Sequence, residues 1–439
     1  MKHTNAVRFG RTLLVAVVVI AAIALIGCQR DGEGGGGDTE VVTLEYMLWD
    51  ANQQPAYEQV AARFTELHPG IEISIVQLGW NDYWTDISRR MVGGDAPDVF
   101  TNHLAFANDF ARRNQIIDIQ PLVEADDVNV DQYFEGLADL WTRDGRRWGL
   151  PKDWDTIAVV INEDLFRAAG VDPDALDSWT WNPDDGGTFA EVLRQVGDAG
   201  DHFGFGTLYS SPFGQQEWSN LAHSTGWVYS PGPYSNQFNY DQDGLHQTMD
   251  WYVRMIDQGV FAPLEDVSSI GDATLFTSGR IAGTFAGSWM IGHYVNNAEF
   301  PIRFVPLPIG PVGRRSAFNG LADSIWVGTE HPGEAWEWVK FLASEEAQAI
   351  VGQAGVVFPA VRGTEQLAFQ AHADRGVDVS AYTMLVEDPE TTFLFPLTDN
   401  APEVMDVFED ALEAVFLQDA PSSQPLTAAN QRVNELLQN

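Results

Sequence analysis

Apolar and polar positions change period several times over the sixty residues that follow position 40. Residues 41–50 form an apolar, partly alternating run that predicts a strand, and residues 55–67 repeat apolar side chains at helical spacing. The change recurs, with strands predicted at 71–78 and 98–100 and a helix at 80–92. Strands and helices in this order, joined by short connections, predict an α/β layer with a mostly parallel sheet.

The ends of these predicted strands carry side chains that suit a binding site. Ligands of parallel α/β sheets bind outside the carboxyl ends of the strands. The residues that the sequence places there are Trp49, Asp50, Trp80, Asn81 and Asn102. We therefore predict that these five residues contact a ligand.

One stretch in the middle of the chain combines charges, an indole and a strong strand signal. Lys152, Asp153, Trp154 and Asp155 follow a proline and lead into the β-branched run 157–161. Asp153 and Asp155 would share one face of a strand. Glycoside hydrolases use a pair of nearby carboxyl groups, so an exported glycoside hydrolase is one hypothesis. The two carboxylates of such an enzyme act on both sides of a sugar, which neighbouring positions on one turn do not readily allow. We therefore interpret the stretch as part of a binding site.

Other catalytic and metal-binding patterns are missing from the sequence. It contains no His-Glu-x-x-His motif, no Gly-x-Ser-x-Gly motif and no Walker lysine motif. The segment Asp241-Gln-Asp-Gly244 lacks the remaining oxygen ligands of a calcium loop, and we interpret it as the start of a helix. We predict that the protein is not an enzyme and needs no cofactor or metal.

The first forty residues have the features of an export signal followed by a tether. Residues 13–26 are apolar, follow three basic residues and end at Leu-Ile-Gly-Cys28. This ending resembles the lipobox of bacterial lipoproteins, in which the cysteine becomes the lipidated first residue of the mature protein. We therefore predict a signal peptide at 1–27, lipidation of Cys28 and a glycine-rich tether at 28–40.

Size and charge narrow the possible partners. A chain of 439 residues exceeds the usual size of a single core, so two domains or lobes are expected. Acidic residues outnumber basic ones 63 to 24, and the resulting net charge of −39 repels nucleic acid and anionic lipid. The acids are spread along the whole chain, and we interpret this as a surface adapted to high salt. With one cysteine, no internal disulfide can form.

Four motifs along the chain point to a known family. They are Phe64-x-x-x-His-Pro-Gly-Ile-Glu-Ile-Ser74, Gly93-Gly-Asp-Ala-Pro-Asp-Val-Phe100, Asn162-Glu-Asp-Leu-Phe-Arg-Ala-Ala-Gly-Val-Asp172 and the segment 274–290. In this order they resemble the signatures of extracellular solute-binding proteins of ABC importers, in the carbohydrate-binding, maltose-binding-protein-like branch (family 1). The resemblance implies a two-lobed α/β fold of the periplasmic-binding-protein type II, with a hinge between discontinuous lobes.

The resemblance also implies that the chain crosses between the lobes more than once. We predict lobe 1 from residues 41–153 plus 286–322, and lobe 2 from residues 154–285 plus 323–439. The stretch around Trp154 would then be the first crossing, on the hinge side of a closing cleft.

The tryptophan content suits a saccharide ligand. The chain has 15 tryptophans; indole rings stack on the C–H faces of sugars, while Asp, Asn and Arg pair with hydroxyl groups. Tryptophans inside regular elements are expected to fill cores, and those at element ends to meet either the ligand or a packed rim. Gly287, Ser288 and Trp289 open a helix whose free amides could also meet a polar ligand. The predicted ligand-binding set is Trp49, Asp50, Trp80, Asn81, Asn102, Lys152, Trp154, Asp155, Trp227, Gly287, Ser288, Trp289 and Asn319.

These features together predict a monomeric receptor that is exported and lipid-anchored at the periplasmic or extracellular face of the membrane. As the resemblance implies, it would bind its ligand, here a mono- or oligosaccharide, in the interlobe cleft, close about its hinge and deliver the solute to the transmembrane subunits of an ABC permease. A receptor for a non-sugar solute, such as a polyamine, a peptide or a polyol phosphate, is the alternative of the same architecture. An exported glycoside hydrolase is the alternative of another class.

Overall fold

The computed structural model describes residues 41–209, 211–386, 388–417 and 421–438. The predicted signal peptide, the lipidated Cys28 and the tether lie outside the described residues. Within the described ranges, no helix is both long enough and apolar enough to span a bilayer.

A four-stranded sheet organises the first part of the chain. The strands are β1 (Val42–Leu48), β2 (Ile71–Gln77), β3 (Val99–Asn102) and β11 (Ala322–Ile325), in the spatial order β11-β3-β1-β2. β2 and β3 pair with β1 in parallel, and β11 adds to β3 in the antiparallel direction. The predicted α/β layer is therefore confirmed, with one strand added from far along the chain.

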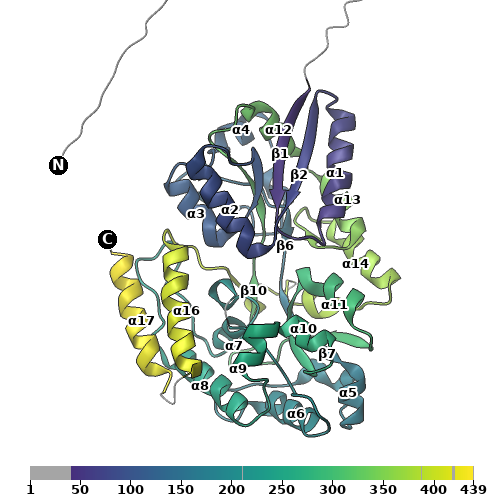
Figure 1. The fold of residues 1–439 in the computed structure, drawn as a ribbon, viewed down its shortest axis with the longest axis vertical. Coiled ribbons are helices and arrows are strands. Elements are labelled where there is room, and N and C mark those ends of the chain that lie inside the picture. Colours follow the sequence, from purple (N-terminus) through teal and green to yellow (C-terminus); the bar gives the residue numbers. More distant parts are fainter. Residues whose placement is uncertain (1–40, 210, 387, 418–420, 439) are drawn as a thin grey trace, which may run out of the picture. The chain divides into compact units, whose positions relative to one another are not determined.

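Side chains along β1 alternate between the two faces of this sheet, and both faces are buried. Leu44, Tyr46 and Leu48 are buried in one cluster, whereas Met47, which points the other way, is buried in a second. Trp338 packs edge-on against Tyr46 with ring centroids 5.5 Å apart. The helices around the sheet are α1 (Gln54–Leu67), α2 (Trp80–Gly93), α3 (Leu104–Arg112), α4 (Gln120–Ala125), α12 (Pro332–Leu342) and α13 (Glu345–Ala354), as Figure 1 shows.

A three-stranded antiparallel sheet organises the second part. Its central strand, β7 (Ile157–Asn162), is buried over its whole length and lies between β8 (Gly283–Gly287) and β9 (Ile302–Val305). Burial on both faces explains the continuous β-branched run of β7. The other α-helices of the described residues are α5 (Glu163–Ala168), α6 (Gly187–Gly197), α7 (Trp218–Ser224), α8 (Asp243–Asp257), α9 (Leu264–Ile270), α10 (Asp272–Thr277), α11 (Ile291–Asn297), α14 (Glu365–Asp374), α15 (Ser380–Thr383), α16 (Ala401–Leu417) and α17 (Ser423–Leu436).

Three segments that link the two sheets run side by side. The backbone N–H of Lys152 donates to the carbonyl of Leu321 at 2.9 Å, and the N–H of Ala360 donates to the carbonyl of Lys152 at 3.3 Å. The short strands of this region are β6 (Asp153–Trp154) with β12 (Phe358–Pro359), β10 (Ser316–Phe318) with β13 (Thr392–Leu394), and β4 (Thr142–Arg143) with β5 (Arg146–Arg147). We call residues 151–155, 319–322 and 358–360 the crossing segments.

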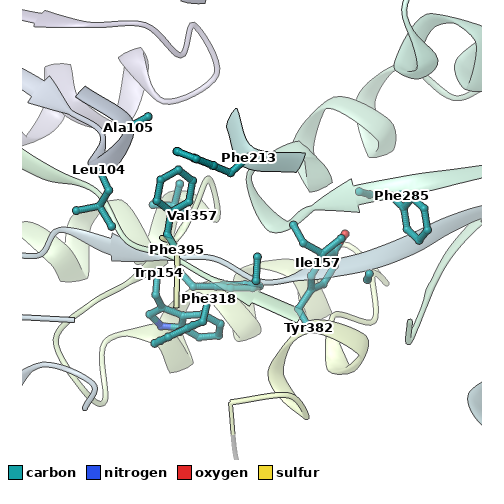
Figure 2. Packing of buried hydrophobic residues seen from close by; sticks show 14 of the residues in the cluster. Leu104, Ala105, Trp154, Ile157, Phe213, Phe285, Phe318, Val357, Tyr382 and Phe395 are labelled. Carbon is teal, nitrogen blue, oxygen red and sulfur yellow. The ribbon is translucent and has the colours of Figure 1, made fainter. Parts of the chain in front are cut away.

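Apolar side chains fill the space beside the crossing segments. Trp154 packs against Phe318 and Phe358, with ring centroids 6.1 Å and 4.8 Å away, and Figure 2 shows it next to Phe318. Figure 2 also shows Ile157 farther along the same strand, beyond the crossing. The crossing is therefore a packed core with a hydrogen-bonded backbone.

The strand pairings correct the predicted lobe boundaries. Residues 286–287 and 302–305 were assigned to lobe 1, yet they pair with β7 in the second sheet. Residues 323–325 were assigned to lobe 2, yet they pair with β3 in the first sheet. The chain returns to the first sheet through the crossing segment 319–322, which runs antiparallel to residues 151–155 and leads directly into β11.

Candidate functional site

A cavity of about 360 Å³ lies where both sheets meet the crossing segments. Its size falls in the range of small-ligand pockets. Eight residues of the predicted ligand-binding set line it, namely Trp49, Asp50, Trp80, Asn81, Trp154, Asp155, Ser288 and Trp289. The structure therefore brings together side chains that the sequence placed on separate elements, and their contact with a ligand stays a prediction.

The wall from the first sheet is aromatic. Trp49 follows β1 and Trp80 begins α2, and both indoles are half-buried. Their rings meet edge to face with centroids 5.0 Å apart, and Trp80 meets His103 in the same way at 5.5 Å. Such mutual packing holds each ring in a fixed orientation while part of its surface stays open.

Polar groups continue this wall beside the indoles. Asp50 accepts a hydrogen bond from the backbone N–H of Asn52 at 2.8 Å and another from the side chain of Gln53 at 2.9 Å. Asn81 is exposed in the first turn of α2. Asp50 thus keeps a fixed carboxylate at the rim, with lone pairs left for a ligand donor.

Two buried carboxyl groups come from the first crossing segment. Oδ1 of Asp153 accepts a hydrogen bond from the backbone N–H of Leu321 at 2.8 Å, and its Oδ2 has no hydrogen-bond partner among the described residues. Oδ1 of Asp155 accepts from the side-chain amide of Gln215 at 2.8 Å. Burial raises the pKa of Asp153 to about 6, against the opposing effect of Lys152, and burial together with Asp153 raises the pKa of Asp155 well above its usual value.

The opposite wall comes from the end of β8. Ser288 is buried, and its backbone N–H donates to the carbonyl of Thr156 at 3.1 Å. Trp289 is half-buried in the single 3₁₀ turn 288–290. Gly287 does not line the cavity, because the Trp289 ring lies over its backbone: a Cβ there would be 2.2 Å from the indole. The predicted ligand contact of Gly287 is corrected to a role in positioning Trp289.

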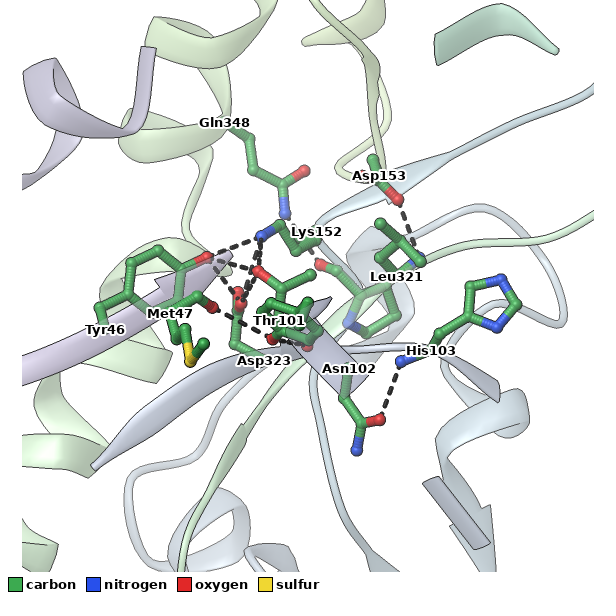
Figure 3. Close-up of polar contacts among 12 residues, drawn as sticks. Tyr46, Met47, Thr101, Asn102, His103, Lys152, Asp153, Leu321, Asp323 and Gln348 are labelled. Atoms are coloured by element: carbon green, nitrogen blue, oxygen red, sulfur yellow. Dashed lines mark hydrogen bonds and ion pairs between the residues drawn. The ribbon is translucent and has the colours of Figure 1, made fainter. Parts of the chain in front are cut away.

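The predicted ligand contact of Lys152 is also corrected, because its side chain belongs to a closed polar network (Figure 3). Its Nζ donates to the hydroxyls of Tyr46 and Thr101 at 2.8 Å and 3.0 Å, and lies 3.1 Å from Oδ1 of Asp323. The side chains of Lys152 and Asp323 are each 2% exposed. This ammonium group therefore ties the crossing segment to the first sheet and is not open to the cavity.

Three other predicted contacts lie away from the cavity lining. Asn102 is fully buried, and its side chain donates to the hydroxyl of Ser324 on the neighbouring strand β11 at 3.0 Å. Trp227 donates to the carbonyl of Asn239 at 2.8 Å and is buried among aromatic rings. Asn319 is fully buried, and its side-chain nitrogen lies 3.2 Å from Nε2 of His103. Asn319 thus stands behind a lining residue instead of contacting the cavity itself.

Several lining residues were not among the predicted contacts. They are Gln53, His103, Asp153, Leu208, Ser211, Pro212, Gln215, Gln216, Leu321 and Val357. His103 directly follows the third strand, so the strand-end rule contained a signal for it. Burial lowers the pKa of His103 to about 4, so its ring is neutral at pH 7. Gln215 and Val357 carry no local signal, because only the fold brings them to the crossing.

A metal site has no support in the described part of the chain. There, no group of three or more His, Cys, Asp or Glu side chains is arranged to hold a metal ion. The cavity instead offers indole faces, carboxyl groups and amides, which are groups that bind an organic solute.

Comparison with known proteins decides the family. The model of the family described as bacterial extracellular solute-binding protein matches residues 50–349. The chain belongs to this family. Two relatives of this solute-binding protein come from Bacillus subtilis (strain 168). The maltodextrin-binding protein MdxE is 23% identical, covering 95% of this chain and 94% of the relative. The arabinooligosaccharide-binding protein is 23% identical, covering 76% of each.

Solved structures show the same fold. An ABC substrate-binding protein of Listeria monocytogenes, in complex with cycloalternan, superposes with a TM-score of 0.79 at 19% identity. The match covers 91% of this chain and 99% of that chain. The predicted two-lobed α/β fold of a solute-binding protein is thus confirmed, and membership places the protein among binding proteins that act outside the cytoplasm.

Proposed function

We propose that this solute-binding protein is the saccharide receptor of an ABC importer. The observation that carries the proposal is the cavity wall, in which half-buried indoles face the same space from both sheets. Trp49 and Trp80 come from the first sheet and Trp289 from the second. Sugar rings present apolar C–H faces to such indoles and hydroxyl rims to the carboxyl and amide groups between them. Maltodextrin and arabino-oligosaccharides, for which the two Bacillus subtilis relatives are named, are consistent with this class.

Binding at this place couples the solute to the arrangement of the lobes. A saccharide that contacts Trp49 and Trp289 together interacts with both sheets, so it binds the closed arrangement more tightly and shifts the population toward it. The crossing segments are the hinge about which this happens. The permease then distinguishes loaded from empty receptor by the closed surface.

The test is titration of the purified protein with maltodextrins and arabino-oligosaccharides, followed by tryptophan fluorescence and calorimetry. We expect saturable binding, and we expect Trp289→Ala to weaken it about tenfold or more, equivalent to about 1.4 kcal/mol for each factor of ten. Trp326→Ala is the matched control, because Trp326 is also half-buried but lies outside the cavity lining. Equal losses in the two variants, or no binding of any saccharide, would contradict the proposal.

We also propose that the receptor is a monomeric lipoprotein that releases its solute unchanged. Cys28 after an apolar run supports lipidation. Cys28→Ala should move the protein from the membrane fraction to the soluble exported fraction. Mass spectrometry of a bound oligosaccharide after long incubation should return the intact ligand, whereas shortened products would show hydrolysis.

A further inference from the structure

The titratable side chains that line the cavity are strongly one-sided in charge. Three are carboxylic acids, Asp50, Asp153 and Asp155, and the fourth is His103. No lysine or arginine is among the lining residues in the described part of the chain. Because His103 is buried and neutral at pH 7, nothing in the wall offers a positive charge to a ligand.

The two acids of the crossing segment also lack a full set of partners. Asp153 is 3% exposed, and its Oδ2 is buried with no hydrogen-bond partner among the residues that the structure describes. Asp155 is 8% exposed, with the neutral amide of Gln215 as its side-chain hydrogen-bond donor. The charge of Lys152, next in sequence, acts on Asp153, but its Nζ is held by Asp323 and two hydroxyls and not by either acid. Burying carboxyl oxygens that lack a hydrogen-bond partner is costly, so a donor from the ligand would stabilise these two acids.

We propose that the solute is a saccharide bearing a protonated amine, and that the amine binds at Asp155 beside Asp153. This inference rests on the proposed saccharide-receptor function and narrows its ligand class. An ammonium group supplies N–H donors to both carboxyl groups and a positive charge to the buried acids. Trp154 and Trp289 line the same cavity, and an amine bound over either indole face would gain cation–π attraction as well. Phosphorylated and uronic saccharides meet only like charge here and are excluded.

The experiment compares saccharides that share a skeleton and differ in charge. Glucose, galactose and mannose are paired with their 2-amino derivatives, and cello-oligosaccharides with β-1,4-glucosamine oligosaccharides of equal length. Each is titrated by calorimetry at pH 7, together with glucuronic acid. We expect at least one amino member to bind tenfold or more tightly than its neutral partner, and the uronic acid not to bind.

Failure of this inference is distinguishable from failure of the proposed function. If the neutral saccharides bind as tightly as every amino partner, the proposed preference for an amine is wrong, whereas the proposed saccharide-receptor function is unaffected. Binding of spermidine with no binding of any saccharide would overturn both. Tight binding of the uronic acid would overturn the charge argument directly.

Two variants test whether the preference for amino saccharides depends on Asp155. Asp155→Asn keeps the acceptor for Gln215 but loses the negative charge, so affinity for the amino saccharide should fall about tenfold while that for a neutral saccharide changes less. Asp164→Asn is the control, because Asp164 is exposed in the first turn of α5, away from the cavity. Thermal unfolding of both variants verifies folding. An equal loss for charged and neutral ligands in Asp155→Asn would overturn the assignment.

Discussion

The ammonium group of Lys152 lies 3.1 Å from Oδ1 of Asp323, and both side chains are sealed from solvent. Lys152 belongs to the first crossing segment and Asp323 to β11, so the contact fixes the crossing to the edge of the first sheet. The hydroxyls of Tyr46 and Thr101 complete the donors and acceptors around it. Since the pair is buried, the loss of either partner leaves a charge without compensation.

Lys152→Met should destabilise the protein by about 3–5 kcal/mol, because it leaves Asp323 charged and unpaired in the core. Chemical denaturation measures the change, and adding Asp323→Asn should recover part of it. Lys340→Met is the control with the same substitution. Lys340 pairs with Asp126 and Glu337 at the surface, where such pairs contribute about 0–1 kcal/mol. Similar losses in both single variants would contradict the network described above.

Gly287→Ala should weaken ligand binding without unfolding the protein. The backbone of Gly287 is extended, at φ −71° and ψ 151°, so alanine adopts it without strain. The added Cβ would overlap the Trp289 ring and push the indole out of its position over the backbone. Gly292→Ala is the control, because a Cβ there meets no atom within 4 Å. Unchanged saccharide affinity in Gly287→Ala, measured by calorimetry, would show that the position of this indole does not matter.

Glu217 should make stability depend on pH. Burial raises the pKa of Glu217 to about 8, against the hydrogen bond from Ser211, and the nearby acids Asp272 and Glu409 raise it further. The folded protein holds this proton up to about pH 8, whereas the unfolded chain releases it near the ordinary glutamate pKa of 4.5. The contribution is therefore full below pH 4.5 and is lost as pH rises through 8.

Glu217→Gln should remove this part of the pH profile and raise the free energy of unfolding most at pH 8 and above. Denaturant titrations at pH 5, 7 and 9 measure it. Glu191→Gln, at an exposed position of α6, should leave the profile as it is. A profile with the same slope in wild type and Glu217→Gln would show that this carboxyl group is already ionised in the fold.

Local patterns were sufficient for β1, β2 and β3 and for four of the five residues predicted at their ends, whereas Asn102 is buried against Ser324. Trp49 and Trp80 were predicted from the strand-end rule alone, and both line the cavity. Trp289 was predicted from its place at the start of a helix, and it lines the cavity just after β8. These residues could be placed at the cavity because the position of a residue at a strand end is set by its near neighbours in sequence, and their contact with a ligand stays a prediction.

The features that were not predicted from the sequence depend on contacts between residues far apart in the chain. Lys152 looked like an exposed ligand contact, but its partner Asp323 lies 171 residues away, and only pairing of the two chain segments seals it. Gln215 reaches Asp155 from 60 residues away with no local motif to announce it. The lobe boundaries failed for the same reason, since the strand partner of β3 is distant in sequence.

β11 is synthesised long after β3, its partner in the first sheet, and this limits the order in which the protein can fold. Residues 322–325 cover one side of β3, and residues 319–322 and 358–360 complete the crossing on both sides of residues 151–155. A nascent or truncated chain that stops before residue 322 leaves β3 as a bare edge strand, which invites pairing with other chains. The amino-terminal sheet therefore cannot mature during synthesis ahead of the rest, and N-terminal fragments of this receptor should aggregate.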